Sequence, residues 1–241
     1  MAWKDQRVML IDTSRCIGCK ACVVACKQWH QLGAETTAFT GSYQIPPDLS
    51  GNNLTYVKFT ESTTAEGPGM FEGMKWLFFK DQCRHCFRPK CARACPTGVS
   101  TTSEGFVLFN SNCKDANLRP RKKKVGGSLV PMTFAEHCPY NIPRFSPALD
   151  QYVKCDFCYD RFASSDPHLN TTTACEAACP AGAIVTGSYT SIFDLGGSNS
   201  EARKRLKAAK RTHPLAKIIG GKYGRAKVYY LLTDLPEVFG Y

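Results

Sequence analysis

Residues 16–26 read CIGCKACVVAC, which places four cysteines at the spacing C-x2-C-x2-C-x3-C. The chain of 241 residues contains fourteen cysteines, and twelve of them fall into three groups of four. The groups are Cys16, Cys19, Cys22 and Cys26; Cys83, Cys86, Cys91 and Cys95; and Cys155, Cys158, Cys175 and Cys179, while Cys113 and Cys138 stand apart. Both sulfurs of a CxxC pair point to one place, so the pattern favours metal binding over disulfides.

The rest of the composition fits a globular protein, since 43% of the residues are hydrophobic. No run of apolar residues reaches the length of a membrane-spanning helix, so none is expected. The sequence begins MAWKDQRVMLID, which lacks an apolar segment of signal-peptide length. We therefore expect no export signal on this chain, and disulfide scaffolds of the short secreted type are disfavoured.

The formal net charge of +11 raises the question of a nucleic-acid partner. An oxidised cluster of four irons with four thiolates carries about −2, so three such sites would lower the charge by about six. The basic residues then partly balance cofactors. We expect the basic run at 119–124 to be a solvated loop and the basic helix at 198–212 to cover a domain edge.

Hydrophobic patterning and breakers predict short elements between the cysteine groups. The expected strands lie at 8–12, 54–59, 74–80, 105–110, 184–189 and 227–234, and helical structure is expected at 21–27 and 198–212. Ser200 is the expected N-cap of the second helix. The sequence therefore predicts an α+β protein whose helices and strands are short.

The first cysteine group has the spacing of bacterial ferredoxins. In that motif three thiolates lie on one cubane, and the fourth lies a turn along a helix and ligates a different cluster. Such a chain must supply a second group to complete each site. Cys95 and Cys179 precede prolines as ferredoxin motifs require, and Cys138-Pro139 looks like the end of a further motif whose first cysteines are replaced by a basic insertion.

The complete pattern resembles the iron–sulfur subunits of molybdenum or tungsten oxidoreductases with a bis-pyranopterin cofactor. Five stretches are similar to the small subunit of soluble tungsten- or molybdenum-dependent formate dehydrogenases of sulfate-reducing bacteria. They are CKQWHQL at 26–32, GSYQIPPDLSGNNLTYVKFTE at 41–61, WLFFKDQCRHC at 76–86, CPYNIPRF at 138–145 and KCDFCYDR at 154–161. The resemblance covers nearly the whole chain.

The resemblance implies that motifs pair first with fourth and second with third, which gives three [4Fe-4S] clusters. The implied ligand sets are Cys16, Cys19, Cys22 and Cys179 for cluster one; Cys26, Cys155, Cys158 and Cys175 for cluster two; and Cys83, Cys86, Cys91 and Cys138 for cluster three. Cys95 and Cys113 lack two partners and are expected to be unligated. A disulfide between them, or a fourth cluster completed by His137 or another side chain, remains an open alternative.

The resemblance also implies the fold: two ferredoxin-like units of the bacterial 2[4Fe-4S] type, one of them depleted to a single cluster, with surface loops and a C-terminal helix–strand extension. Residues 1–32 with 140–190 would form one unit and 70–139 an inserted second unit. Residues 33–69 would be a surface loop region, and 191–241 the extension.

Four-cysteine clusters are coordinatively closed, so the expected function is electron transfer without a catalytic site on this chain. The resemblance implies a large catalytic subunit with a tungsten or molybdenum pterin that oxidises formate, and an external carrier such as a multihaem cytochrome c or a ferredoxin. It implies export of the assembled pair to the periplasm on the partner's signal, with the cytoplasm as the alternative. Other interpretations are the iron–sulfur subunit of a nitrate, polysulfide or dimethyl sulfoxide reductase, or a zinc-ribbon protein that binds nucleic acid.

Overall fold

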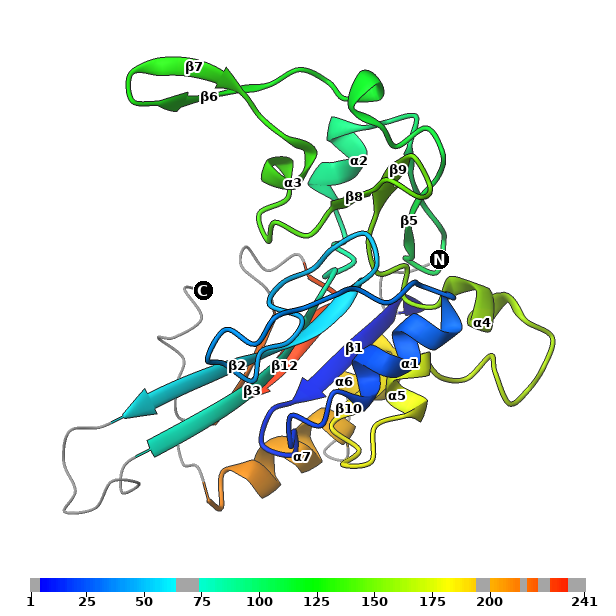
Figure 1. The fold of residues 1–241 in the computed structure, drawn as a ribbon. Helices are drawn as coiled ribbons and strands as arrows, with labels where there is room; N and C mark the ends of the chain where they lie inside the picture. The colour runs from blue at the N-terminus through cyan, green and yellow to red at the C-terminus, as the bar shows by residue number, and fades with distance from the viewer. Residues whose placement is uncertain (1–4, 64–73, 194–199, 213–215, 221–225, 234–241) are drawn as a thin grey trace.

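A four-stranded sheet lies at the centre of the fold (Figure 1). The computed structural model describes residues 5–63, 74–193, 200–212, 216–220 and 226–233. The strand order is β10 (Ile184–Ser188), β1 (Arg7–Asp12), β12 (Val228–Leu232) and β11 (Lys217–Gly220). Strand β1 runs antiparallel to β10 and parallel to β12, so the last strand of the described chain lies in the middle of the sheet.

Strand β1 is buried on both faces, which explains its continuous apolar run. Met9 and Ile11 pack into one hydrophobic core together with Tyr230, whereas Val8 and Leu10 pack into another on the opposite side of the strand. Alternate side chains of a strand point to opposite faces. Both faces of the sheet are therefore covered by other elements.

One face is covered by the hairpin of β2 (Thr55–Thr63) and β3 (Met74–Gln82). Phe79 of this hairpin stacks on Tyr230 of β12, with ring centroids 4.2 Å apart. The other face is covered by α6 (Tyr189–Phe193) and α7 (Glu201–Ala209), whose residues pack in the core around Val8 and Leu10. Aromatic stacking and aliphatic burial thus hold the two layers on the sheet.

Helix α1 (Ala21–Trp29) packs against α5 (Ala174–Ala177), which is distant in sequence. Cys22, Val23 and Cys26 form its buried face, at the i, i+1 and i+4 positions that lie on one side of a helix. The short helix α4 (Tyr159–Ala163) precedes α5. The first and last cysteine groups are therefore neighbours in space although about 150 residues of sequence separate them.

Residues 83–153 form the upper part of the molecule in Figure 1 and consist of short elements. These elements are α2 (Lys90–Ala94), β4 (Val99–Thr101), β5 (Val107–Phe109), η2 (Asp115–Asn117), β6 (Lys122–Val125), β7 (Ser128–Pro131), α3 (Phe134–His137), β8 (Arg144–Ser146) and β9 (Gln151–Val153). A small hydrophobic core around Phe134, Val99 and Tyr152 holds them together.

The basic run at 119–124 differs from its prediction. Its side chains are exposed as expected, but its second half is strand β6, which pairs with β7 in an exposed hairpin. Gly126 and Gly127 close the hairpin with φ values of 53° and 89°. Two central residues with positive φ make the turn that fits the twist of paired strands, and glycine adopts it without steric cost. The loop prediction is therefore wrong for 122–124.

The other predicted elements are found within a few residues of their expected bounds. The strand predicted at 54–59 extends to Thr63, and the predicted basic helix is α7 with Ser200 as its N-cap, whose side chain accepts a hydrogen bond from the Arg203 backbone at 3.2 Å. Three pieces of the predicted elements lie outside the described residues: 64–69 of the loop region, 198–199 of the basic helix and 234 of the last strand.

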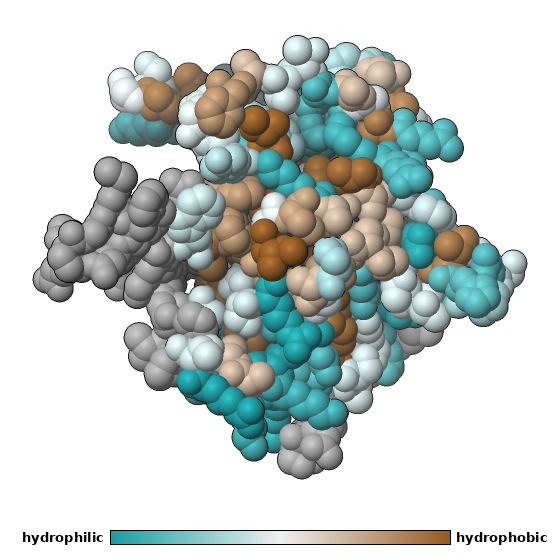
Figure 2. All heavy atoms as spheres, turned by 60° about the horizontal axis from the view of Figure 1, so that its bottom comes forward, coloured by the Kyte–Doolittle hydropathy of each residue, from teal (hydrophilic) through white to brown (hydrophobic). Residues whose placement is uncertain are grey.

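The molecular surface is mixed in character. Figure 2, which turns the bottom of Figure 1 toward the viewer, shows hydrophilic residues gathered in the lower part of that face and hydrophobic residues scattered above them. Within the described ranges, no helix has the length and apolar character needed to cross a membrane.

Candidate iron–sulfur centres

The ligand set expected for cluster one is called quartet one here and consists of Cys16, Cys19, Cys22 and Cys179. Cys16 and Cys19 lie in the loop after β1, Cys22 lies on α1, and Cys179 follows α5. Cys16 lies within electrostatic range of Cys19 and Cys179, and Cys22 within range of Cys16 and Cys179. Gly18 and Lys20 have φ values of 67° and 62°, and this left-handed backbone folds the loop around the sulfurs.

Quartet two consists of Cys26, Cys155, Cys158 and Cys175. Cys26 lies on α1 and Cys175 on α5, and the other two lie in the loop after β9. Cys155 is within electrostatic range of Cys26, and Cys158 within range of Cys155 and Cys175. Phe157 and Cys158 have positive φ values of 67° and 53°, so the CxxC loop again turns through left-handed backbone.

Quartet three consists of Cys83, Cys86, Cys91 and Cys138, and all four line one cavity. Cys86 and Cys91 lie within electrostatic range of both Cys83 and Cys138. His85, between the first two cysteines, has a φ of 44°. Each quartet thus combines a loop that contains a non-glycine residue of positive φ with at least one cysteine from a distant segment, which is the kind of local strain found at functional sites.

Backbone amides point at the sulfurs of all three quartets. His85 N lies 3.4 Å from Cys83 Sγ, Phe157 N lies 3.4 Å from Cys155 Sγ, and Ala183 N lies 3.3 Å from Cys179 Sγ. Each N–H donates to a sulfur. Such donors stabilise a thiolate and are one of the levers that set cluster potentials.

The pKa values of these thiols indicate that the thiolates need a positive centre beside them. Burial, supported by neighbouring sulfurs, raises the pKa of Cys22, Cys86 and Cys91 to about 12 in each case. Four thiolates in such a space require a cationic centre to offset their repulsion and lost hydration. All fourteen cysteines lie in described residues and are free thiols. The donor sets therefore fit [4Fe-4S] clusters, each held by four cysteines.

Comparison with known proteins agrees with this geometry. Two family models described as "4Fe-4S dicluster domain" match residues 15–99 and 74–189. The formate dehydrogenase 2 subunit beta (cytochrome c-553) of Nitratidesulfovibrio vulgaris is 36% identical over 236 residues, which cover 96% of this chain and 95% of the relative. The chain belongs to the family of formate dehydrogenase iron–sulfur subunits.

Other members of this formate dehydrogenase family are similarly close. The formate dehydrogenase subunit beta of Megalodesulfovibrio gigas is 33% identical, with 95% of this chain and 94% of the relative covered. The nitrate-inducible formate dehydrogenase iron–sulfur subunit of Escherichia coli is 33% identical, with 98% and 72% covered. These relatives are iron–sulfur subunits and not catalytic ones, so the predicted role as a non-catalytic subunit of an oxidoreductase complex is confirmed.

The three quartets of this family member follow one another in space. Cys22 of quartet one lies within electrostatic range of Cys175 of quartet two. Cys155 of quartet two lies within range of Cys83 of quartet three. Quartet two therefore lies near both of the other quartets, and Cys19 of quartet one is exposed.

Cys95 and Cys113 lie together beyond quartet three. Both are fully buried, Cys113 is hydrogen-bonded to Cys95, and Cys113 lies within electrostatic range of Cys91. They belong to the small core around Phe134. Burial, followed by the neighbouring Cys95 thiol, raises the pKa of Cys113. The structure places the two thiols side by side without a disulfide.

Lys80 is a functional residue that the sequence pattern did not reveal. It is 2% exposed on β3, and its ammonium group donates to Gln82 Oε1. It lies within electrostatic range of Cys22 of quartet one and of Cys175 of quartet two. Burial opposes its charge, but the neighbouring sulfurs prevail and raise its pKa. Lys80 thus places a positive charge between two quartets.

Two further buried lysines surround quartet three. Lys227 lies within electrostatic range of Cys83 and Cys86, and burial lowers its pKa to about 8. Its Nζ donates to Gln6 Oε1 at 3.1 Å and to the Gly105 carbonyl. Lys154 lines the quartet-three cavity, and its Nζ donates to the Cys155 carbonyl at 3.0 Å. Lys154 follows β9 and Lys227 precedes β12, and a lysine next to an apolar strand gives little signal in sequence because only tertiary packing shows that it lies near a sulfur.

His85 makes two hydrogen bonds with the backbone. Its Nδ1 accepts from the Val107 amide at 3.2 Å, and its Nε2 donates to the Cys155 carbonyl at 2.9 Å. Burial, followed by the nearby Lys154 and Lys227 charges, lowers its pKa well below the usual value. The ring is therefore neutral, and it joins the loops of quartets two and three without offering a nitrogen to iron.

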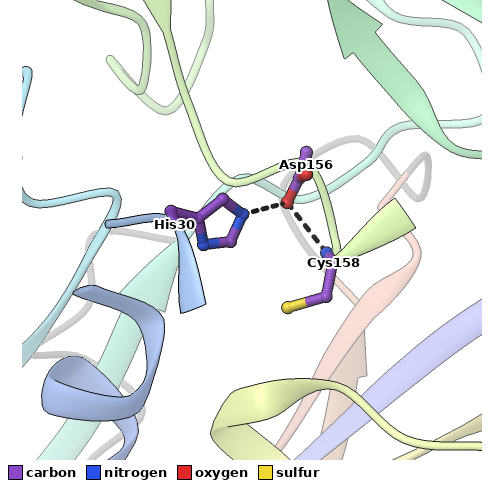
Figure 3. A group of neighbouring side chains, drawn as sticks. All are labelled: His30, Asp156 and Cys158. Carbon is purple, nitrogen blue, oxygen red and sulfur yellow. Dashed lines mark hydrogen bonds and ion pairs between the residues drawn. The ribbon is translucent and has the colours of Figure 1, made fainter. Parts of the chain in front are cut away.

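His30, Asp156 and Cys158 form a second feature that sequence reasoning missed (Figure 3). Their ligand atoms lie within 4.8 Å of one another, a spacing that suits a metal ion. However, His30 Nε2 pairs with Asp156 Oδ1 at 2.9 Å, and the same oxygen accepts from the Cys158 amide at 2.8 Å. Cys158 belongs to quartet two, so the pair braces that quartet. The sequence did contain a local signal for His30, since this residue follows Cys26 by one helical turn.

Proposed function

We propose that this chain carries three [4Fe-4S] clusters and passes electrons between a tungsten or molybdenum formate dehydrogenase catalytic subunit and an external carrier. The observation that supports it is the arrangement of the twelve cysteines in three successive quartets, each gathered from separate segments. The family of formate dehydrogenase iron–sulfur subunits supports the identity of the catalytic partner.

Each cluster would supply one-electron redox chemistry when bound. The proposed ligands are those of quartets one, two and three, and four cysteines leave no iron open to substrate. The chain's own residues then hold the relay: the left-handed loops fix the sulfurs, the backbone amides donate to them, and Lys80, Lys154 and Lys227 compensate their charge. Formate oxidation belongs to the partner subunit.

We further propose two ferredoxin-like units, of which the inserted one at 70–139 retains a single cluster. The pairing of β1 with β10 and the packing of α1 on α5 support a first unit made of residues 1–32 and 140–190. In the second unit the place of another cluster would be taken by the apolar core that contains Cys95 and Cys113.

The external carrier is proposed to be a c-type cytochrome or a ferredoxin. The printed name of the Nitratidesulfovibrio vulgaris relative includes cytochrome c-553, which supports the first. We also propose that the assembled pair works in the periplasm, after export on the catalytic subunit's signal. Cell fractionation with and without the twin-arginine export system tests this, since disabling export should leave the subunit in the cytoplasm.

Iron and sulfide quantitation with EPR on the anaerobically purified complex tests the proposed function. The expected result is about twelve irons on this subunit, with spectra of three reduced [4Fe-4S] clusters on formate addition. About sixteen irons would require ligands beyond the three quartets. Zinc without iron would contradict the proposal, as would a lack of cluster reduction when the complex turns over formate.

A further inference from the structure

A cationic pocket lies on the surface beside quartet three. It has a volume of about 510 Å³, and its walls carry Lys90, Arg93, Arg119 and Arg121. Ala94, Pro120 and His137 complete the lining. Positive side chains gathered around one hollow favour the binding of an anion there. The pocket thus has the charge and the size to receive a carboxylate group.

His137 gives a second and independent indication of a ligand. It is 5% exposed, it lines the same pocket, and its Nε2 has no hydrogen-bond partner among the residues that the structure describes. A buried polar atom left without a partner is costly, and native structures rarely contain one without a reason. An oxygen atom of a bound carboxylate would satisfy it.

The pocket is held in shape by the backbone. The Arg119 amide donates to the Ala94 carbonyl at 2.8 Å, which fixes the arginine loop on α2. The Met132 amide donates to the Arg121 carbonyl at 2.8 Å, which fixes the start of the β6–β7 hairpin. Glu136, adjacent to His137, does not neutralise the pocket, because its carboxylate binds Lys123 and the Thr133 amide.

The position of the pocket connects it to the electron path. Lys90 directly precedes Cys91, and His137 directly precedes Cys138. Because consecutive Cα atoms are about 3.8 Å apart, the lining reaches within one residue of two quartet-three sulfurs. A molecule seated in the pocket would therefore lie close to the last cluster of the path.

The other end of the path has a different surface. Near the exposed Cys19, Lys20 Nζ donates to the Tyr43 carbonyl at 2.5 Å, and Tyr43 packs against Trp76. Phe39, Tyr43 and Trp76 are 69%, 62% and 45% exposed. Exposed aromatic side chains are typical of stable subunit interfaces, whereas opposite charges steer transient encounters. The charged end is therefore the one suited to a carrier that binds and leaves.

We propose that the cationic pocket binds a surface carboxylate of an acidic protein electron carrier, and that electrons leave the chain from quartet three across this contact. The inference rests on the proposed function and adds the exit surface and the charge of the carrier. In the transfer, one electron passes from the third cluster, which is oxidised, to the haem or iron–sulfur centre of the carrier, which is reduced. No bond forms or breaks.

Formate-driven reduction of three acceptors by the intact complex tests the proposal. The acceptors are an acidic c-type cytochrome, a basic c-type cytochrome and methyl viologen, each at low and high salt. The test variant is R119E/R121E, and the matched control is K204E/K207E, which reverses two exposed charges on α7 at the opposite end of the molecule (Figure 1). Both variants change the net charge by the same amount.

We expect the KM for the acidic cytochrome at low salt to rise at least about tenfold in R119E/R121E, because electrostatic steering is lost. Viologen reduction and the iron content should stay unchanged, the control should match the wild type, and high salt should remove the difference. H137L should also raise this KM, and H137Q, which keeps an N–H donor, should restore part of it.

An equal KM for the acidic cytochrome in wild type and R119E/R121E would overturn the proposal, as would an equal rise in the α7 control. Phosphate binding measured by calorimetry adds a further arm. If R119E/R121E loses phosphate binding while the cytochrome kinetics stay unchanged, the pocket binds small anions and the docking proposal fails. If the wild-type complex reduces no viologen with formate, the proposed function itself fails, which separates the two outcomes.

Discussion

Quartet two and the Cys95–Cys113 pair are both buried clusters of thiols, yet they differ in what surrounds them. Quartet two has four sulfurs, an amide donor to Cys155 and the Lys80 ammonium within electrostatic range. The pair has two sulfurs in an apolar core with Phe134 and Tyr152. Both regions are buried and both have a lysine within electrostatic range, Lys80 for quartet two and Lys154 for Cys113. The number of sulfurs, four against two, is what separates the proposed metal centre from the apolar core.

The packing around Cys95 and Cys113 leaves little space beside the two sulfurs. A Cβ added at Gly98 would lie 2.5 Å from Cys113 Cα and 2.7 Å from Cys95 Sγ, so backbone and sulfur fill the space. The cavity of quartet three, in contrast, is lined by all four of its cysteines. The same stretch of sequence thus contains one open sulfur-lined site and one filled core.

Removal of sulfurs from each region should give the largest effect on iron content and the clearest difference between the two regions. We expect Cys155→Ser to lose about four irons per chain, because three thiolates hold the cubane poorly, and to abolish formate-driven carrier reduction. Part of the fold should be lost as well, since cluster binding contributes to folding. Iron analysis, EPR and circular dichroism measure these changes.

The matched control is the double variant C95A/C113A. It should keep about twelve irons and reduce carriers at the wild-type rate, because neither sulfur is a proposed ligand. Iron loss in C95A/C113A equal to that in Cys155→Ser would show that the pair contributes to a cluster and does not differ from quartet two in this respect.

The second prediction concerns the filled core. Gly98→Ala should destabilise the region around Cys95 by about 1–3 kcal/mol, because the new methyl group overpacks against Cys113. Faster hydrogen exchange at the Val99 and Tyr152 amides would report it, while the iron content stays constant. Gly33→Ala is the control, since its added carbon would meet only Asn52, at 3.9 Å. Equal exchange in both variants would mean that the core has spare room.

The sequence predicted those features that depend on local pattern. A continuous apolar run predicted strand β1, and the place of Ser200 before a basic amphipathic segment predicted the N-cap of α7. Both are found as expected. The C-x2-C spacing favoured metal binding, and the resemblance to iron–sulfur subunits of bis-pyranopterin oxidoreductases implied the three sets of four sulfurs. The structure places each predicted set of four together, although the ligand assignments themselves stay predictions.

Other features depend on distant contacts and left no local signal. Lys80 ends the strand predicted at 74–80 and looks in sequence like an ordinary charged terminus. In the structure β3 continues to Gln82, and its pairing with β2 and its packing on β12 place Lys80 near the sulfurs. Strand β12 inserts beside β1, which no pattern within residues 228–232 specifies. The β6–β7 hairpin was missed because three consecutive lysines obscure a strand whose only marker is Gly126-Gly127.

Lys80 supplies the smallest test of the comparison, since it is a buried charge within electrostatic range of the sulfurs of quartets one and two. Lys80→Met removes a positive charge that stabilises the reduced, more negative state, so the reduction potentials of the clusters in quartets one and two should fall. A unit charge at this range contributes about 1–2 kcal/mol at an effective dielectric constant of about 20. For a one-electron couple that corresponds to roughly 40–90 mV.

Redox titration followed by EPR would resolve this shift, with Lys204→Met on the exposed face of α7 as the control that removes the same charge far from any sulfur. The cluster of quartet three should shift less, because the neighbouring lysines there are Lys154 and Lys227. If all three potentials moved equally, the loss would reflect a general change in net charge or packing. If none moved, solvent or the amide donors would compensate the thiolates, and the Lys80 charge would have no part in the proposed clusters of quartets one and two.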